Sequence, residues 1–484
     1  MADPNADKSE NGSHSIAEPM SEQRIPSTAI SAIRFPFKLT MDQLEAVDQW
    51  VSNGYKGSII YSTGTGKTEI AFECAKRAAK SLELAEDTPL SDNNMHKKAN
   101  SSRSHFNILF LVPRIVLIEQ NIKRLVKYGV PKEFIGAYFG ERKELREITI
   151  STYQSAVNNI DLIHNAHMIV FDEVHLVSDT ATSLSAIFNT VKEANNSKLL
   201  LGLTATIDEE DPRYETILSL MPPVKKYMIK EAVRDKRLAK PVVIPIKVHL
   251  TKDEKKMYVE YSKNIRNISS YLNTSDPKSI SALLVKRGHL AGLARAWFAN
   301  VKNRKILLSC AQNKLLAATE VITQKHPSER IMVFSETIES IQRLQAKLQI
   351  KGTKSEIISA KLKSEQRQNI LSQWGKQFLA LLSVHTLEIG YDVPEVSVAI
   401  ILASTSNMNQ VVQRIGRVVR NYEGKEKALI YNVYLSNTGD VSTLNRLKRA
   451  ADISREDAHN KARLDSRGTI RKSHTNAKLD EYIF

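Results

Sequence analysis

A short loop near residue 65 combines two glycines, one lysine and three threonines. Its residues are Thr63, Gly64, Thr65, Gly66, Lys67 and Thr68. Glycines let backbone N–H groups approach an anion closely, and a lysine ammonium neutralises its charge. A hydroxyl at the end of such a loop can bind Mg²⁺. The pattern predicts a phosphate-binding loop, in which Lys67 contacts the β- and γ-phosphates of a nucleotide and Thr68 holds Mg²⁺.

One position of this loop departs from the strict pattern, which places a glycine five residues before Gly66. Tyr61 occupies that position. The loop alone therefore leaves an alternative open, namely a glycine-rich turn with an incidental lysine.

Two adjacent carboxylates end an apolar run further along the chain. Asp172 and Glu173 close the segment "MIVFDE", whose apolar residues predict a buried strand. Two acids at such a place are costly unless they meet a cation or do chemistry. We expect Asp172 to bind Mg²⁺ and Glu173 to deprotonate the water that attacks the terminal phosphate. We expect His175 to transmit the state of the bound nucleotide to neighbouring loops. The alternative is that His175 is an ordinary histidine at an interface.

A row of arginines lies in "QVVQRIGRVVR", residues 410–420. Arg414, Arg417 and Arg420 recur every three residues, so Arg417 and Arg420 fall near one helical face. Such a pair can reach a γ-phosphate from a facing domain and stabilise the charge that develops there. A solvated basic helix face is the alternative.

The charge of the whole chain points to a polyanionic partner. It carries a net charge of +16 over 484 residues, with a pI of about 9.5. Between residues 251 and 305 there are 12 Lys or Arg and 4 Asp or Glu. Nucleic acid is the usual partner of such a segment, whereas solubilising surface charge is the bland alternative.

The remaining composition predicts an intracellular protein. No stretch reaches the roughly 20 apolar residues that span a bilayer. The two cysteines, Cys74 and Cys310, cannot form a disulfide framework. We expect a protein of the cytoplasm or nucleoid, or of the nucleus in a eukaryote, that is neither secreted nor membrane-bound.

The elements that must position these residues read as strands alternating with helices. "GSIIYS" (57–62) predicts a strand before the loop, and "EIAFECAKRAAK" (69–80) predicts a helix after it. Apolar runs followed by helical patterns recur to about residue 206 and again between residues 241 and 435. This alternation predicts an α/β fold with two parallel-sheet domains.

The expected organisation has four parts and one insert. We predict a disordered tail at 1–34, a first domain at 35–225, a second domain at 226–440 and a charged tail at 441–484. Pro222 and Pro223 break the pattern near the joint. The basic segment 251–305 is helix-compatible and is predicted to interrupt the second domain after its first strand.

Taken together, the motifs resemble those of superfamily 2 helicases and translocases of the DEAD/DEAH type. "STGTGKT" resembles motif I, whose family form often lacks the first glycine, so Tyr61 is tolerated. The other resemblances, in family order, are "LTMDQLEAV", "LVPRIVLIEQ" (motif Ia), "STYQS", "DEVH" (II), "GLTAT" (III), "IMVFSET" (IV), "TLEIGYDVP" (V) and "QRIGRVVR" (VI).

The resemblance implies tandem RecA-like domains that hydrolyse ATP with Mg²⁺, and it assigns further residues. It implies that Gln43 reads the adenine and that motif V contributes Gly390 and Asp392. It places Gln413 beside Arg417 and Arg420 among the catalytic residues of motif VI. The nucleic-acid contacts that it implies are Arg114, Thr152, Tyr153, Ser383 and Thr386.

Within that superfamily the second half is similar to XPB-type DNA helicases. The cues are "NRKILLSCAQNKLLAATEVI", "MVFSETIESIQRL" and the run from Ser383 to Arg420. The basic segment lies where that family inserts its thumb, so Lys286, Arg287, Arg295 and Trp297 are expected to clamp or wedge nucleic acid, with a solvated helical pair as the alternative. The N-terminal damage-recognition domain and the Arg-Glu-Asp element of that family are not evident.

These features predict an ATP-dependent DNA helicase or duplex translocase that acts in repair, recombination or transcription. An RNA helicase and the motor subunit of a restriction or defence complex are the alternatives. The apolar residues Leu479, Tyr482 and Phe484 near the end resemble a docking peptide for a protein partner. Their alternative is a tail helix that packs on its own protein.

Overall fold

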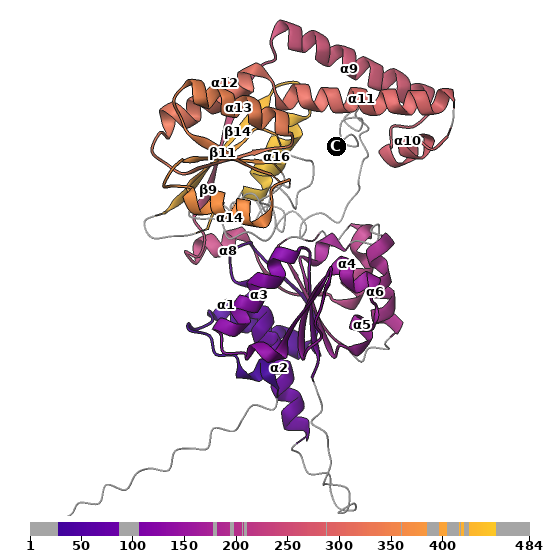
Figure 1. The fold of residues 1–484 in the computed structure, drawn as a ribbon, viewed down its shortest axis with the longest axis vertical. Coiled ribbons are helices and arrows are strands. Elements are labelled where there is room, and N and C mark those ends of the chain that lie inside the picture. Colours follow the sequence, from indigo (N-terminus) through magenta and orange to yellow (C-terminus); the bar gives the residue numbers. More distant parts are fainter. Residues whose placement is uncertain are drawn as a thin grey trace, which may run out of the picture.

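The computed structural model describes residues 28–86, 106–177, 182–193, 198–205, 207, 211–286, 288–359, 361–384, 396–403, 416, 418–420 and 425–451. Within them the chain forms two α/β domains, one above the other in Figure 1. The predicted fold class, two parallel-sheet domains with a helical insert in the second, is confirmed.

The first domain contains an eight-stranded sheet in the order β4-β3-β5-β2-β6-β7-β1-β8, in which only β3 and β4 pair antiparallel. Its strands are β1 (Lys56–Tyr61), β2 (Ile108–Val112), β3 (Ile135–Phe139), β4 (Arg142–Lys143), β5 (Ile148–Thr152), β6 (Met168–Asp172), β7 (Leu199–Thr204) and β8 (Pro223–Tyr227). Because β1, β2, β5, β6 and β7 run parallel, the residues that follow them meet at one edge of the sheet.

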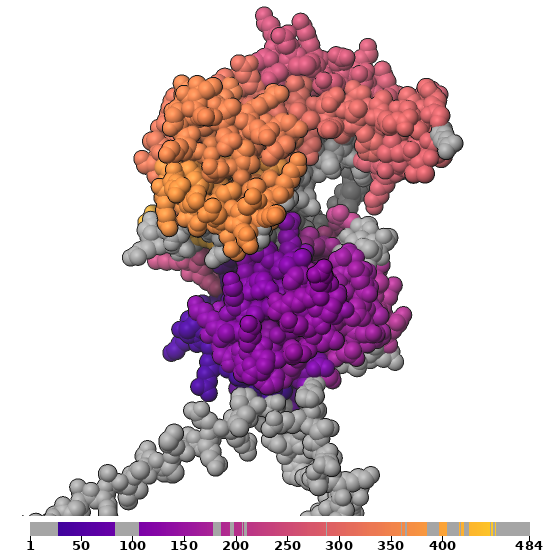
Figure 2. All heavy atoms as spheres, viewed as in Figure 1, coloured from indigo at the N-terminus to yellow at the C-terminus, as the bar shows by residue number. Residues whose placement is uncertain are grey.

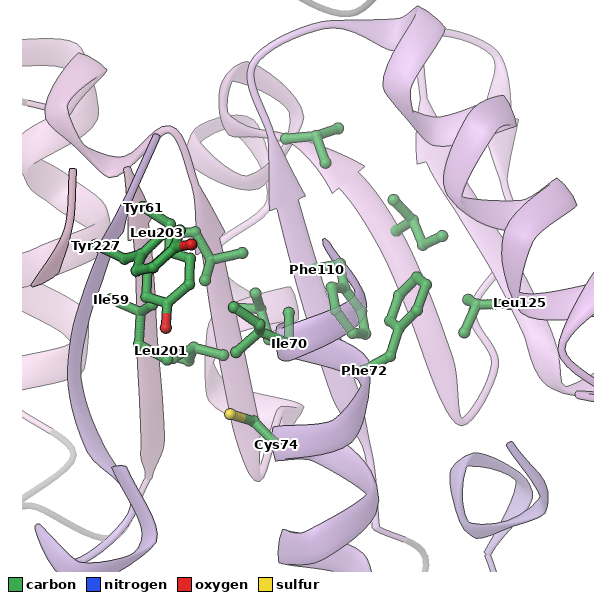
Figure 3. Packing of buried hydrophobic residues seen from close by; sticks show 14 of the residues in the cluster. Ile59, Tyr61, Ile70, Phe72, Cys74, Phe110, Leu125, Leu201, Leu203 and Tyr227 are labelled. Carbon is green, nitrogen blue, oxygen red and sulfur yellow. The ribbon is translucent and has the colours of Figure 1, made fainter. Parts of the chain in front are cut away.

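Helices cover both faces of this sheet. They are α1 (Met41–Ser52), α2 (Lys67–Glu86), α3 (Ile115–Lys127), α4 (Tyr153–Asn158), α5 (Asp161–Asn165), α6 (Thr182–Glu193), α7 (Glu215–Leu220) and α8 (Ile229–Arg234), with short 3₁₀ turns at Ala29–Ala32, Lys132–Phe134, Val174–Leu176 and Pro212–Tyr214. Alternate residues of β2 enter different cores, since Phe110 packs with Phe72 of α2 (Figure 3), whereas Leu109 packs on the other face.

The second domain contains a six-stranded, wholly parallel sheet in the order β11-β12-β10-β13-β14-β9. Its strands are β9 (Lys240–Val248), β10 (Ile331–Ser335), β11 (Ser355–Ser359), β12 (Ala380–Val384), β13 (Val398–Ile401) and β14 (Lys427–Leu435). Its helices are α12 (Gln312–Glu320), which continues as a π-helical turn (Val321–Lys325), α13 (Ile338–Ile350), α14 (Ser364–Gln373) and α16 (Asp440–Ala451).

An arm of three helices interrupts the second domain between β9 and α12. It consists of α9 (Lys252–Tyr271), α10 (Pro277–Leu283) and α11 (His289–Ser309). α9 and α11 lie side by side and carry α10 at their far end (Figure 1). Ile265, Ile280, Ala294 and Trp297 form a small core of the arm's own. Figure 2 shows the arm projecting from the second domain and overhanging the first.

Two features at the predicted boundaries differ from the sequence-based expectation. Ile30 and Ile33, assigned to the tail, are fully buried in the core of the first domain because they are apolar and lie within and directly after a 3₁₀ turn. Pro223 does not break the strand pattern of the first domain. It starts β8, the outermost strand of the sheet, where a missing N–H is tolerated.

Candidate nucleotide site and nucleic-acid surface

The predicted phosphate loop connects β1 to α2. Gly64 and Gly66 have φ angles of 88° and 87°, in the left-handed region that favours glycine. Lys67 begins α2, and its Nζ donates a hydrogen bond of 3.0 Å to the carbonyl oxygen of Tyr61. The loop therefore lies at the N-terminus of a 20-residue helix, where backbone N–H groups favour anions.

Tyr61 is the last residue of β1, and its side chain belongs to the core. The ring is fully buried and stacks on Tyr227 with centroids 5.1 Å apart (Figure 3). Its hydroxyl donates to the carbonyl oxygen of Asp42 at 2.7 Å. Only the backbone carbonyl of Tyr61 faces Lys67, which explains why a large side chain is compatible with the loop.

Gln43 contacts the loop from the first turn of α1. Its Oε1 accepts from the backbone N–H of Thr40 at 3.0 Å, which forms a capping box. Its Nε2 donates to the carbonyl oxygen of Thr65 at 3.1 Å. The predicted adenine-reading residue is therefore buried beside the phosphate loop and fixed at both ends.

The carboxylate pair lies at the end of β6, near the middle of the sheet. Burial and, to a smaller extent, the neighbouring Glu173 raise the pKa of Asp172 to about 7, while Lys67 opposes the shift. Glu173 has a φ of 52°, a left-handed conformation that is uncommon for a residue other than glycine. Asp172 is thus prepared for a cationic partner, and a strained turn presents Glu173.

Three buried polar atoms of the site have no hydrogen-bond partner within the part of the chain that the structure describes. They are Thr63 Oγ1, Glu173 Oε2 and His175 Nε2. The other ring nitrogen of His175 lies 2.9 Å from Thr204 Oγ1, and burial lowers its pKa. Because buried polar groups are normally satisfied, these atoms fit a site that takes a polar ligand such as a triphosphate.

The second domain meets the loop through the segment that carries Arg420. A Cβ atom added to Gly64 would lie 3.2 Å from Arg420 Cγ, and one added to Gly416 would lie 2.6 Å from Thr63 Cβ. The side chain of Arg420 therefore packs against Gly64 of the first domain, and the side chain of Thr63 packs against Gly416 of the second domain. The other predicted residues of motifs V and VI, Gly390, Asp392, Gln413 and Arg417, lie outside the described residues.

A cavity of about 980 Å³ lies between the two domains, on the side of Arg114 and Thr152. Arg367 of α14 also lines it, so both domains contribute a cation. The sequence-based prediction missed Arg367 and the exposed Lys123, because neither belongs to a recognised motif. The hydroxyl of Thr152 also caps α4, since it accepts from the N–H of Ser155 at 3.2 Å.

Three of the residues predicted to contact nucleic acid have buried side chains. Tyr153 is 4% exposed, and its hydroxyl donates to the carbonyl oxygen of Asp172 at 2.7 Å. Ser383 is 1% exposed at the end of β12. Trp297 lies in the core of the arm and donates from Nε1 to Ser269 Oγ at 2.8 Å. The side chains of Tyr153 and Trp297 are buried because their aromatic rings pack among apolar neighbours. Ser383 is buried because β12 has a neighbouring strand on each side.

The other predicted contacts are solvent-facing or fall outside the described residues. Lys286 and Arg295 are exposed on the arm. Thr386, Arg287 and the C-terminal Leu479, Tyr482 and Phe484 lie outside the part of the chain that the structure describes. Among the described helices, none is long and apolar enough to cross a bilayer.

Comparison with protein families gives two matches. Residues 36–209 match the family described as "Type III restriction enzyme, res subunit", and residues 313–422 match the "Helicase conserved C-terminal domain". The first match contains the phosphate loop and the carboxylate pair, and the second contains Arg420.

Several curated proteins are similar over most of the chain. The "DNA 3'-5' translocase XPB2" of Sulfurisphaera tokodaii is 26% identical over 88% of this chain and 88% of its own length. The "DNA 3'-5' helicase XPB" of Mycobacterium tuberculosis is 26% identical over 69% of this chain. The chain spans only about half, 54%, of that second relative.

Solved structures share the fold at lower identity. The helicase domain of Pyrococcus furiosus Hef is 17% identical, with a TM-score of 0.51 over 83% of this chain and 97% of its own. The DNA-bound Type ISP restriction-modification enzyme LlaBIII is 16% identical, with a TM-score of 0.55 over 86% of this chain and 30% of its own. The motifs, the two family matches and these relatives show that the chain is similar to superfamily 2 helicases and, among them, to proteins with the XPB name.

Proposed function

We propose that this protein is an ATP-dependent DNA motor, a helicase or duplex translocase that couples ATP hydrolysis to movement on DNA. One observation carries the proposal. The lysine loop of the first domain lies directly against the segment of the second domain that bears Arg420. A nucleotide between them would contact both domains, so its hydrolysis would change how they sit together.

The residues of the first domain would hold ATP and Mg²⁺. The N–H groups of the loop and Lys67 would bind the phosphates, Thr68 and Asp172 would hold Mg²⁺, and Gln43 would contact the base. The bound Mg²⁺ would neutralise charge on the phosphates. Glu173 would orient the attacking water and accept its proton, because it is next to Asp172 on a sharply turned backbone.

Arg420 would act from the second domain, with Arg417 and Gln413. Charge develops on the terminal phosphate during transfer, and a guanidinium stabilises it most when water is excluded. Because Arg420 belongs to the other domain, hydrolysis would be fast only when the two domains are closed.

DNA is the favoured track. The curated relatives with the XPB name are named for action on DNA. The interdomain cavity is lined by Arg114, Lys123 and Arg367, and its polar side chains suit a sugar–phosphate backbone. The arm carries further exposed lysines, which would add to the affinity for phosphates.

A second candidate is the motor of a restriction or defence complex. The match of residues 36–209 to a restriction-enzyme subunit and the likeness to LlaBIII favour it. In that case the motor would be the same, and a partner chain would supply the nuclease.

The test is a panel of ATPase rates with duplex DNA, single-stranded DNA and RNA at equal nucleotide concentration and fixed salt. We expect DNA to stimulate turnover more than tenfold, and RNA to stimulate it much less. Stimulation by RNA alone would assign the protein to the RNA helicases. The absence of ATP hydrolysis with every nucleic acid would overturn the proposal.

A further inference from the structure

The connector between the two domains contacts both halves of the nucleotide site. We define the connector as residues 237–239, which follow α8 and precede β9. Arg237 is half-buried, and Leu238 and Ala239 are buried. None of them belongs to a helicase motif that the sequence revealed.

Arg237 extends into the first domain. One terminal nitrogen of its guanidinium lies 2.5 Å from Asp42 Oδ2 and 3.1 Å from Thr40 Oγ1. The other donates to the carbonyl oxygen of Thr65 in the phosphate loop. The guanidinium also lies over the ring of Tyr227, 5.3 Å from its centroid. Only a planar side chain with several donors makes all of these contacts at once.

The contact with Thr65 orients the peptide that precedes Gly66. The same carbonyl oxygen also accepts from Gln43 Nε2, so two donors hold it on one side. In a trans peptide the C=O and the following N–H point in opposite directions. Holding the Thr65 carbonyl therefore turns the N–H of Gly66 away from Gln43 and Arg237, as a phosphate-binding loop requires.

The next two residues of the connector bond to the arginine-bearing segment. Leu238 pairs with Arg420 in an antiparallel bridge, and the N–H of Ala239 donates to the carbonyl oxygen of Val419 at 2.8 Å. The side chain of Arg420 then lies against Gly64. Three consecutive residues thus fix the backbone of the phosphate loop and the backbone of Arg420 relative to each other.

We propose that Arg237 is a positioning residue for ATP hydrolysis, which keeps the phosphate loop and Arg420 in register through the connector. The inference rests on the proposed function and adds a residue to it. Arg237 touches no phosphate in this proposal. It acts through Thr65 on nucleotide binding and through residues 238 and 239 on the placement of Arg420.

The test compares Arg237→Met with Arg234→Met in the full chain. Methionine keeps much of the length of the side chain and its packing on Tyr227 but removes every donor. Arg234 is a matched control, because it is three residues away, its side chain is 73% exposed, and it pairs only with the adjacent Asp235 among the described residues. Arg237→Lys keeps the positive charge but not the forked N–H donors of the guanidinium, and it is expected to restore part of the activity that Arg237→Met loses.

The expected result is a change in both kinetic constants at an unchanged melting temperature. For Arg237→Met, misplacement of loop and arginine should lower kcat about tenfold or more and raise KM for ATP several-fold. Arg234→Met should match the wild type. Equal kinetics for the two variants, or a drop in melting temperature that accounts for the loss of activity, would overturn the proposal.

A double variant tests the route through Arg420. If Arg237 acts on kcat by placing Arg420, adding Arg237→Met to Arg420→Met should lower kcat by less than about threefold more. If the fold-loss in kcat of the double variant equals the product of the fold-losses of the two single variants, Arg237 does not act through Arg420. A wild-type protein that hydrolyses no ATP with any nucleic acid would instead mean that the proposed function fails, so the two failures are distinguishable.

Discussion

At the scale of single residues, Asp172 and Glu173 at the end of β6 both have energetically unfavourable features. Glu173 adopts a left-handed backbone, which costs on the order of 1 kcal/mol or more for a residue other than glycine. Asp172 keeps a raised pKa because it is buried beside a second acid. The cation and phosphate of the proposed nucleotide complex would offset both costs.

The first prediction separates binding from hydrolysis. Glu173→Gln should bind ATP with nearly normal affinity but hydrolyse it at least about 100-fold more slowly, because it removes a proton acceptor and little bulk. Lys67→Ala should weaken binding itself. Nucleotide titration and single-turnover hydrolysis on both variants make the measurement, and near-normal turnover of Glu173→Gln would remove its role.

The second prediction concerns pH. In metal-free protein Asp172 holds its proton up to about pH 7, whereas the unfolded chain loses it near pH 4. The folded state therefore binds more protons in this window, and the free energy of unfolding should fall as pH rises from 4 to 7. Asp172→Asn should remove up to about 4 kcal/mol of this fall, at about 1.4 kcal/mol per pKa unit.

Denaturant unfolding in the presence of a chelator at several pH values measures the effect. A wild-type curve with the same pH slope as Asp172→Asn would show that the carboxylate is not buried as described.

Sequence alone predicts the residues that recur in motifs but not those that act by proximity. Lys67, Asp172 and Glu173 follow apolar strands, so their place at the sheet edge can be predicted. Arg237 contacts Thr65 across 172 positions of the chain, and no local pattern reports such a pairing. The burial of the Tyr153 ring could not be predicted, because an aromatic residue in a motif does not reveal which way its ring points.

At the scale of elements, the arm combines a basic surface with a buried seam. Lys252, Lys255, Lys256, Lys263 and Arg266 of α9 are exposed and fall within about 100° of one another around the helix axis. Ile265 and Ile268, which pack in the core of the arm, lie on a different face. The basic composition and the helical periodicity of residues 251–305 made these helices predictable. The burial of Trp297 could not be predicted, because it depends on how α9 and α11 pack.

The third prediction follows from that basic stripe. Changing Lys255, Lys263 and Arg266 to glutamine should weaken DNA binding and lower the slope of log affinity against log salt by up to about 3, because each lost phosphate contact contributes about 0.9. The matched control neutralises the exposed Lys351, Lys354 and Lys376 of the second domain.

Fluorescence titrations with labelled duplex over a range of salt provide the slopes. If both triple variants shift the slope equally, the stripe is ordinary surface charge and not a DNA contact.

At the scale of the whole molecule, the two domains interlock through small residues. Thr63 fills the space over Gly416, and Arg420 fills the space over Gly64. These two segments are far apart in the sequence, and they come together only because both glycines lack a side chain. The sequence predicted the two domains, yet this reciprocal fit arises only when both are folded and placed face to face.

The fourth prediction tests this contact. A Cβ on residue 416 would lie 2.6 Å from Thr63 Cβ, so Gly416→Ala should hinder closure and lower kcat on the order of 100-fold. Gly292→Ala is the control, because a Cβ there meets no atom within 4 Å. Each domain should keep its melting temperature. Normal turnover of Gly416→Ala would show that hydrolysis does not need the contact.

The arm is also a lever. Its base is tied to the sheet of the second domain, where Lys305 pairs with the buried Glu336 at 3.3 Å. Since α11 has 21 residues, it is about 30 Å long at 1.5 Å per residue. A rotation of the second domain by about 10° would therefore carry the far end through about 5 Å, more than the rise of one base pair. A small hinge movement at the proposed nucleotide site would thus become a displacement of more than one base pair at the tip.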